Sequence, residues 1–292
     1  MTTLTPFTIH RVATVEEASD TLDRLGEDGV VLCGGTELLL VYKLGFADYS
    51  DVVDIKRIEE LRGIVAQRDE LRIGAATSHR EIERSPIVEE HFPALAQMER
   101  HVGNVRVRNQ GTIGGNVCFA DPHSDPATFL IAAGGDISVR RGGAPARRIA
   151  LEDFVRGPFD TALEPGELAV AVHVPRPRPG SALVHRKMSF QERPAITVAV
   201  HLAAEGGAIT EARIAIGSVG IRAVRARDAE PRLIGLDAVA PDGEAVGAAA
   251  EAAVVASEPV TDANGSAEYK QQLVRVLVAR CVRQAADEAA RS

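Results

Sequence analysis

Two glycine-rich segments are the parts of this chain best suited to binding chemistry. The first is Val31-Leu32-Cys33-Gly34-Gly35-Thr36-Glu37, an apolar run followed by paired glycines and then by helix-forming residues. Paired glycines let a backbone approach a ligand closely, and a helix start offers free N–H groups and the positive end of a dipole. The segment therefore predicts a phosphate site, with an ordinary tight turn as the alternative.

The second segment is Gly111-Thr112-Ile113-Gly114-Gly115-Asn116, which follows the polar residues Arg106, Arg108, Asn109 and Gln110. Successive N–H groups in such a run can form an anion-binding nest, and the side chains of Thr112 and Asn116 add hydrogen-bonding groups. A turn is again the alternative for this loop taken alone. Two such loops in one chain indicate a ligand with two phosphates.

Other chemical motifs are missing or incomplete. The chain has neither the G-x-x-x-x-G-K-[ST] phosphate loop nor the G-x-G-x-x-G dinucleotide fingerprint. In Gly217-Ser218-Val219-Gly220 the serine directly follows the first glycine, so the spacing of a hydrolase nucleophile is not met, and we expect no catalytic nucleophile. The segment Asp121-Pro122-His123-Ser124-Asp125 has no second histidine nearby, which favours a turn whose Asp125 binds a ribose or a backbone amide over a metal site.

The elements that must position these loops are mixed in type. Thr14 and Glu17 predict a helix start, and Pro175–Gly180 is a stiff, polar segment typical of a domain boundary. Strands are expected at 30–33, 51–55, 71–75, 137–140, 168–174 (with His173 at an exposed-type position), 196–202 and 212–216. Helices are expected at 37–40, at 78–103 in two pieces separated by prolines, at 248–256 and at 269–290. Strands and helices do not alternate regularly, which favours an α+β fold over a doubly wound sheet.

Composition excludes several classes of protein. The 292 residues are 45% hydrophobic and 25% charged, as in a globular protein, and their number predicts about two domains. A net charge of −8 argues against nucleic-acid binding. The basic residues Arg140, Arg141, Arg147 and Arg148 cluster around glycines, so we interpret them as a solvated turn or a partner surface.

The cysteines and the N-terminal segment indicate the cellular compartment in which the protein is expected. Cys33, Cys118 and Cys281 form no C-x-x-C pair, so neither a zinc knuckle nor a sequence-adjacent iron–sulfur site is indicated, and reduced thiols are expected. The segment from Met1 to Pro6 lacks the basic and apolar parts of a signal peptide. No apolar run approaches the ~20 residues of a membrane helix. We therefore expect a cytoplasmic protein without a membrane span.

With both glycine loops in view, the chain resembles the FAD-binding medium subunits of the molybdenum hydroxylases, the xanthine dehydrogenase and carbon monoxide dehydrogenase family. Arg108-Asn109-Gln110-Gly111-Thr112-Ile113-Gly114-Gly115-Asn116, continuing to Ala120-Asp121-Pro122-His123-Ser124-Asp125, is similar to the family's R-N-x-G-T-I-G-G-N…A-D-P-x-S-D. Gly34-Gly35-Thr36-Glu37-Leu38 resembles its A-G-G-T-D-L loop. Further similarities, at 166–175 and in the segment Asn264-Gly265-Ser266-Ala267-Glu268-Tyr269, follow in the family's order.

The resemblance implies a fold and a set of binding residues. A two-lobed FAD-binding domain would span 1–176, with lobes of about 1–56 and 57–176, and a smaller α+β C-terminal domain would span 177–292. Both glycine loops would hold the pyrophosphate, Asp125 would contact the ribose or adenine side, and Ala169 and Lys187 would lie near the flavin. A solvated lysine beside Arg186 is the alternative for Lys187. The implied FAD-binding residues are Leu32, Cys33, Gly34, Gly35, Thr36, Glu37, Thr112, Ile113, Gly114, Gly115, Asn116, Asp125, Ala169 and Lys187.

The chain also departs from the family pattern. Cys33 and Glu37 stand where alanine and aspartate are usual. Phe119 is bulky for its place. Where the family often has an arginine–alanine pair and then an aspartate, this chain has Phe190, Gln191 and Pro194. Contacts of these residues with flavin or with a partner are therefore open.

The function implied by the resemblance is electron transfer within a larger enzyme. A large subunit with molybdopterin would hydroxylate the substrate, and a small subunit with two [2Fe–2S] clusters would pass electrons to the FAD of this chain. An acceptor such as NAD⁺, O₂ or a quinone would take them, in a dimer of heterotrimers. A self-contained FAD-dependent oxidoreductase and a binding or assembly protein with an empty nucleotide fold are the alternatives. The substrate stays open, because the large subunit selects it.

Overall fold

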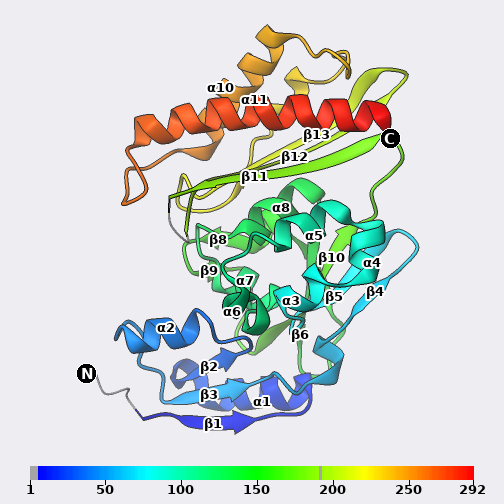
Figure 1. The fold of residues 1–292 in the computed structure, drawn as a ribbon. Helices are drawn as coiled ribbons and strands as arrows, with labels where there is room; N and C mark the ends of the chain where they lie inside the picture. The colour runs from blue at the N-terminus through cyan, green and yellow to red at the C-terminus, as the bar shows by residue number, and fades with distance from the viewer. Residues whose placement is uncertain (1–5, 191–192) are drawn as a thin grey trace.

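A computed structural model describes residues 6–190 and 193–292 and divides them into three stacked parts (Figure 1). The N-terminal part lies at one end, an antiparallel sheet with short helices lies in the middle, and a second antiparallel sheet with two long helices lies at the other end. Strands and helices do not alternate regularly along the chain, so the predicted α+β class is confirmed. Within the described residues, no helix has the length and apolar character needed to cross a membrane.

The N-terminal part is a parallel three-stranded sheet in the order β1-β3-β2. As predicted, Thr14 caps the first helix, and its hydroxyl accepts a hydrogen bond of 3.1 Å from the N–H of Glu17. The strands are β1 (Thr8–Arg11), β2 (Gly29–Leu32) and β3 (Asp51–Asp54), and the helices are α1 (Val15–Leu25) and α2 (Leu38–Lys43). Short 3₁₀ turns, here and further along, are η1 (Gly26–Asp28), η2 (Glu59–Leu61) and η3 (Glu230–Arg232).

The middle part is built on a five-stranded antiparallel sheet in the order β4-β5-β10-β6-β7. Its strands are β4 (Ile64–Ala66), β5 (Glu70–Gly74), β6 (Asp136–Arg141), β7 (Arg147–Ala150) and β10 (Glu167–Pro175), with a small hairpin of β8 (Val155–Gly157) and β9 (Asp160–Thr161). Its helices are α3 (His79–Glu83), α4 (Pro86–His91), α5 (Pro93–Glu99), α6 (Val105–Gln110), α7 (Ile113–Phe119), α8 (Asp125–Ala133) and α9 (Leu151–Phe154).

Two sequence expectations about this part are wrong. The helical stretch at 78–103 forms three helices rather than two, because Pro86 and Pro93 each stand at the first position of a new helix. His173 is buried instead of exposed: Ser138 and Glu70 lie 2.7 Å and 2.8 Å from its two ring nitrogens. Polar partners on neighbouring strands thus allow a polar residue on the covered face of the sheet.

The predicted basic cluster lies on the β6–β7 hairpin and is matched by acidic residues. Arg140 pairs with Glu60 and Arg141 with Asp23, which ties the hairpin to the first part of the chain. Arg147 and Arg148 pair with Glu167 and Glu70. The arginines therefore lie on a solvated hairpin, but most of their charge is compensated within the chain.

The C-terminal part is an antiparallel sheet in the order β11-β12-β13-β14, covered by two helices. The strands are β11 (Ser181–Ser189), β12 (Pro194–Glu205), β13 (Ala208–Gly217) and β14 (Val224–Arg225), and the helices are α10 (Gly243–Ser257) and α11 (Ala267–Arg291). The sequence analysis missed β11, where the consecutive polar residues His185, Arg186 and Lys187 interrupt the apolar strand pattern.

Helix α8 joins the middle and C-terminal parts, since every one of its residues is buried and it packs on β12 and β13. At Gly217 the approach is close: an added Cβ would lie 2.6 Å from the Thr197 hydroxyl oxygen and would also collide with Thr128. Gly217→Ala is therefore expected to destabilise the chain by about 2 kcal/mol, measured by urea unfolding followed by circular dichroism. Gly247→Ala is the matched control, because nothing lies within 4 Å of an added Cβ there and alanine is the better helix former. Equal stability of the two variants would contradict the prediction.

Candidate functional site

The two glycine loops, distant in sequence, touch each other in the structure. The first follows β2, and the second runs from the end of α6 into the first turn of α7. A Cβ added to Gly34 would lie 2.8 Å from the Gly111 Cα and 3.0 Å from the Thr112 nitrogen, so only glycine permits this approach. The Thr112 hydroxyl donates to the Cys33 sulfur at 3.2 Å. The loops thus form one junction between the N-terminal and middle parts.

A cavity of about 310 Å³ opens along this junction. The predicted residues that line it are Cys33, Gly34, Gly35, Thr36, Glu37, Thr112, Gly114, Gly115, Asn116 and Ala169. Its walls continue with apolar residues of β2, of β10 and of the segment after β3, including Val31, Leu168 and Ile55. Small polar groups at one place and apolar walls elsewhere are the usual composition of a cofactor site.

The first loop provides free backbone donors. Gly35 has a φ of 78°, in the region that favours glycine, and this turns the chain into α2. Within the described residues, the N–H groups of Gly35 and Thr36 donate to no acceptor of the protein. Unpaired N–H groups that precede a helix suit an anionic ligand, and this cradle therefore fits a diphosphate.

The second loop does not form the predicted anion-binding nest, because its backbone N–H groups donate to acceptors within the protein. The N–H groups of Ile113 and Gly114 donate to the carbonyls of Thr77 and Ala75, at 3.1 Å and 3.0 Å. The N–H of Gly115 donates to the Thr112 hydroxyl at 3.2 Å. A Cβ added to Gly114 would lie 2.5 Å from the Ala75 Cβ. This glycine run therefore serves close packing of α7 on the end of β5.

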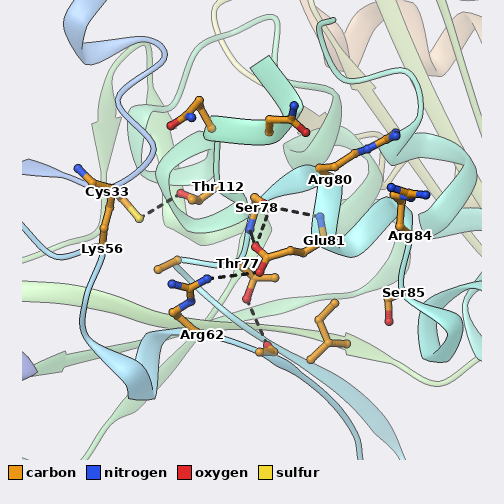
Figure 2. A pocket seen from close by; sticks show the side chains of 15 residues that line it. Cys33, Lys56, Arg62, Thr77, Ser78, Arg80, Glu81, Arg84, Ser85 and Thr112 are labelled. Atoms are coloured by element: carbon orange, nitrogen blue, oxygen red, sulfur yellow. Dashed lines mark hydrogen bonds and ion pairs between the residues drawn. The ribbon is translucent and has the colours of Figure 1, made fainter. Parts of the chain in front are cut away.

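A wider, cationic cleft of about 970 Å³ adjoins the cavity and shares Cys33 and Thr112 with it (Figure 2). Lys56, Arg62, Arg80 and Arg84 line this cleft. Arg62 is held 3.4 Å from Glu81, whose other oxygen accepts from the Ser78 hydroxyl at 2.7 Å. Lys56 and Arg80 also pair with carboxylates, those of Asp54 and Glu83, so most of the positive charge of the cleft is compensated within the chain.

Two predicted residues, Asp125 and Lys187, form a buried ion pair outside the cavity wall. The Lys187 ammonium lies 2.7 Å from an Asp125 carboxylate oxygen and 2.5 Å from the His101 carbonyl. Burial raises the pKa of Asp125, and the charge of Lys187 opposes that rise. Lys187 is therefore not the solvated lysine of the alternative interpretation.

The pair nevertheless belongs to the same region of the fold. Ser124, next to Asp125, donates from its hydroxyl to the side-chain oxygen of Asn116 at 2.6 Å. Asn116 lines the cavity. Leu32 and Ile113, by contrast, are core residues that do not line it.

The departures from the family pattern lie around this region. Phe119 lines the cavity and meets Phe159 edge to face, with ring centroids 5.1 Å apart. Phe190 stacks on Tyr269 at 6.4 Å, and Pro194 begins β12. Gln191 lies outside the described residues. Phe119 is thus part of the cavity wall, whereas Phe190 and Pro194 are not among the residues that line it.

The Asp121–Asp125 segment forms side-chain hydrogen bonds within the chain. One ring nitrogen of His123 lies 3.2 Å from an Asp121 carboxylate oxygen, and the other lies 3.2 Å from the side-chain nitrogen of Asn264. Within 6–190 and 193–292, no group of three histidine, cysteine or acidic side chains is arranged to hold a metal ion.

The three cysteines are protected thiols. Burial raises the pKa of Cys118 and of Cys281 to about 12, and raises the pKa of Cys33 above its ordinary value. Because the thiolate is the reactive form, a thiol with a pKa near 12 is reactive in about one molecule in 10⁴ at pH 8. We expect Ellman's reagent to react slowly with the native chain, faster by about tenfold per pH unit, and at once with all three thiols after denaturation. A thiol that reacts rapidly at pH 7 in the native chain would contradict this.

Sequence reasoning missed several lining residues. His79, at the start of α3, and Leu163 and Glu167, around the start of β10, line the cavity. The capping box of Ser78 and Glu81 is a local signal for the start of α3 after β5, and it could have drawn attention to His79. The residues of β10 reach the cavity wall because β10 pairs with β5 and β6 in the sheet, and this pairing could not be predicted from local sequence.

Two family models match this chain over most of its length. Residues 5–177 match the family model "FAD binding domain in molybdopterin dehydrogenase", and residues 186–285 match "CO dehydrogenase flavoprotein C-terminal domain". The carbon monoxide dehydrogenase medium chain of Hydrogenophaga pseudoflava is 34% identical, over 94% of this chain and 96% of its own. The xanthine dehydrogenase FAD-binding subunit of Escherichia coli O157:H7 is 31% identical, over 76% of this chain and 77% of its own. A solved structure of the Hydrogenophaga pseudoflava enzyme superposes with a TM-score of 0.93, covering 98% of this chain and 99% of that one.

Proposed function

The chain belongs to the FAD-binding medium-subunit family of the molybdenum hydroxylases, and on that basis we propose that it is the electron-transfer subunit of such an enzyme. In this role it accepts electrons from [2Fe–2S] clusters of a partner subunit and passes them to a terminal acceptor. The observation that carries the proposal is the junction of the two glycine loops, where free N–H groups meet an apolar-walled cavity.

Different residues of this chain bind different parts of FAD. The N–H groups of Gly35 and Thr36 bind the diphosphate, and Ala169 and its apolar neighbours enclose the cofactor. Asp125 and Lys187 form one ion pair beyond Asn116, so both would lie at the same end of the cofactor, and the separate predicted contacts of Asp125 with the ribose or adenine side and of Lys187 with the flavin do not both fit. FAD, when bound, supplies one- and two-electron chemistry, and the protein supplies orientation and exclusion of water. The other proposed binding residues are Cys33, Gly34, Glu37, Thr112, Gly114, Gly115 and Asn116, whereas the predicted contacts of Leu32 and Ile113 are dropped because both side chains lie in the core.

The proposal includes partners and organisation. A small subunit with two [2Fe–2S] clusters and a large molybdopterin subunit complete the enzyme, as a dimer of heterotrimers, and NAD⁺, O₂ or a quinone is the acceptor. Residues 1–176 form the FAD-binding domain and 177–292 the C-terminal domain, in a protein of the cytoplasm. The three cysteines of the chain are scattered and buried or half-buried, which suits a subunit whose iron–sulfur clusters are in a partner.

The test is spectroscopic and uses the chain alone and with its partners. The purified chain is expected to show flavin absorption near ~450 nm, to release FAD on denaturation, and to contain no iron. It should not oxidise substrates of the holoenzyme by itself, and its flavin should be reduced by substrate only in the assembled complex. Full substrate turnover by the isolated chain would indicate a self-contained flavoenzyme and contradict the proposal. A chain that binds no FAD would contradict it as well.

A further inference from the structure

A histidine–glutamate pair is buried directly behind the second glycine loop. His79 begins α3 and Glu99 ends α5, and the His79 Nδ1 lies 2.8 Å from a Glu99 carboxylate oxygen. The two side chains are only 2% and 0% exposed. Burying a charged group costs several kcal/mol unless a partner compensates it. A fully buried glutamate with one histidine partner therefore indicates that the pair has a role beyond packing.

The His79 ring lies where the two loops meet. A Cβ added to Gly111 would lie 3.3 Å from the His79 Cδ2 and 3.3 Å from the Thr36 hydroxyl oxygen. The His79 backbone N–H donates to the Gly111 carbonyl at 3.0 Å, which fixes α3 to the second loop. His79 also lines the cavity. Glu99 occupies Nδ1, so Nε2 is the ring nitrogen left for a ligand.

The surroundings of Glu99 make His79 its main partner. The second Glu99 carboxylate oxygen is buried and, within the described chain, has no hydrogen-bond partner. Burial and, to a smaller extent, repulsion from Glu99 raise the pKa of Asp125, while the Lys187 ammonium is engaged by Asp125. The Glu99 side chain therefore acts on the site through its contact with the imidazole.

We propose that His79 binds a phosphate of the FAD diphosphate through Nε2, and that Glu99 is the positioning residue that orients the ring; this inference rests on the proposed function. We assign the contact to the diphosphate of FAD because the Thr36 side chain and the His79 ring both lie beside Gly111, and the N–H of Thr36 is free to bind the same group. Nε2 then donates to a phosphate oxygen, while the Nδ1 side of the ring stays fixed against the Glu99 carboxylate. A hydrogen bond to a charged phosphate is of the stronger kind.

The test compares FAD binding and the phosphorus resonances of bound FAD in variants of the full chain. FAD is removed, and its affinity is measured by quenching of flavin fluorescence. His79→Asn is expected to weaken FAD binding about tenfold, the effect of one hydrogen bond to a charged group. Glu99→Gln is expected to weaken it less, and the double variant no more than His79→Asn alone, since Glu99 acts through the ring. The ³¹P resonances of bound FAD should shift in His79→Asn.

The matched control is His91→Asn, at the C-terminal end of α4, whose side chain is 36% exposed. It should leave both affinity and ³¹P resonances unchanged. Binding within twofold of wild type in His79→Asn would overturn the inference. Weaker binding with unchanged ³¹P resonances would also overturn it, because the imidazole would then touch no phosphate. A wild-type chain that binds no FAD would overturn the proposed function together with the inference, whereas the other two outcomes leave that function intact.

Discussion

Replacing Gly34 with alanine is expected to weaken FAD binding by about 100-fold. The added Cβ would collide with the Gln110 carbonyl and would lie 2.8 Å from the Gly111 Cα, so the loops must separate. Backbone atoms cannot swing aside as a flexible side chain does, and overpacking of this kind costs about 1–3 kcal/mol. Separation of the loops also moves the free N–H groups of Gly35 and Thr36 away from the diphosphate. Each lost hydrogen bond to a charged phosphate costs a further ~1.5–3 kcal/mol. Fluorescence titration of the flavin-free chain measures the effect.

Gly143→Ala is the control for this variant. Gly143 follows β6 on an exposed hairpin, and nothing lies within 4 Å of an added Cβ. Its FAD affinity should equal that of the wild type. If the FAD affinity of Gly34→Ala is within threefold of the wild-type affinity, the contact between the loops is not needed for binding. The proposed site would then lose its main support.

The second large effect is expected from Lys187→Met, which leaves Asp125 buried without its cation. Their side chains are only 16% and 6% exposed, and the Lys187 ammonium is 2.7 Å from the carboxylate. Removing one partner of a buried ion pair costs about 3 kcal/mol or more. The flavin-free variant should therefore unfold at lower urea concentration, followed by circular dichroism.

The loss should depend on pH in a defined direction. Burial already raises the pKa of Asp125, and without Lys187 that pKa rises further. The folded variant then holds this proton more tightly than the unfolded chain, so its stability falls as pH rises above the ordinary range of an aspartate. The deficit should be larger at pH 8 than at pH 5.

Two further variants make this prediction decisive. Adding Asp125→Asn to Lys187→Met removes the buried charge and should recover much of the stability. Lys56→Met removes an exposed partner of Asp54, with a lysine side chain 45% exposed, and should cost less than about 1 kcal/mol. Equal costs for Lys187→Met and Lys56→Met would show that the buried pair is not structurally important.

Much of the fold was predictable because its signals are local. The cap at Thr14, the strand before Gly34 and the long C-terminal helices follow from residue types within one or two turns. The three helices at 79–99 were predicted as two, since a proline both ends one helix and begins the next. Strand β11 and the burial of His173 were not predictable, because both depend on neighbouring strands.

By itself, the sequence determined the class of this protein: the two glycine loops, their order and the motif from Arg108 to Asp125 indicate the flavoprotein family. Only the tertiary structure decided how these residues divide the work. It gave free N–H groups to the first loop, assigned the glycines of the second to close packing, buried the Asp125–Lys187 pair and brought His79 to the junction. The physical reason is that glycine patterns record where a backbone must approach another group closely. Whether that group is a ligand or another strand depends on contacts between segments far apart in the chain.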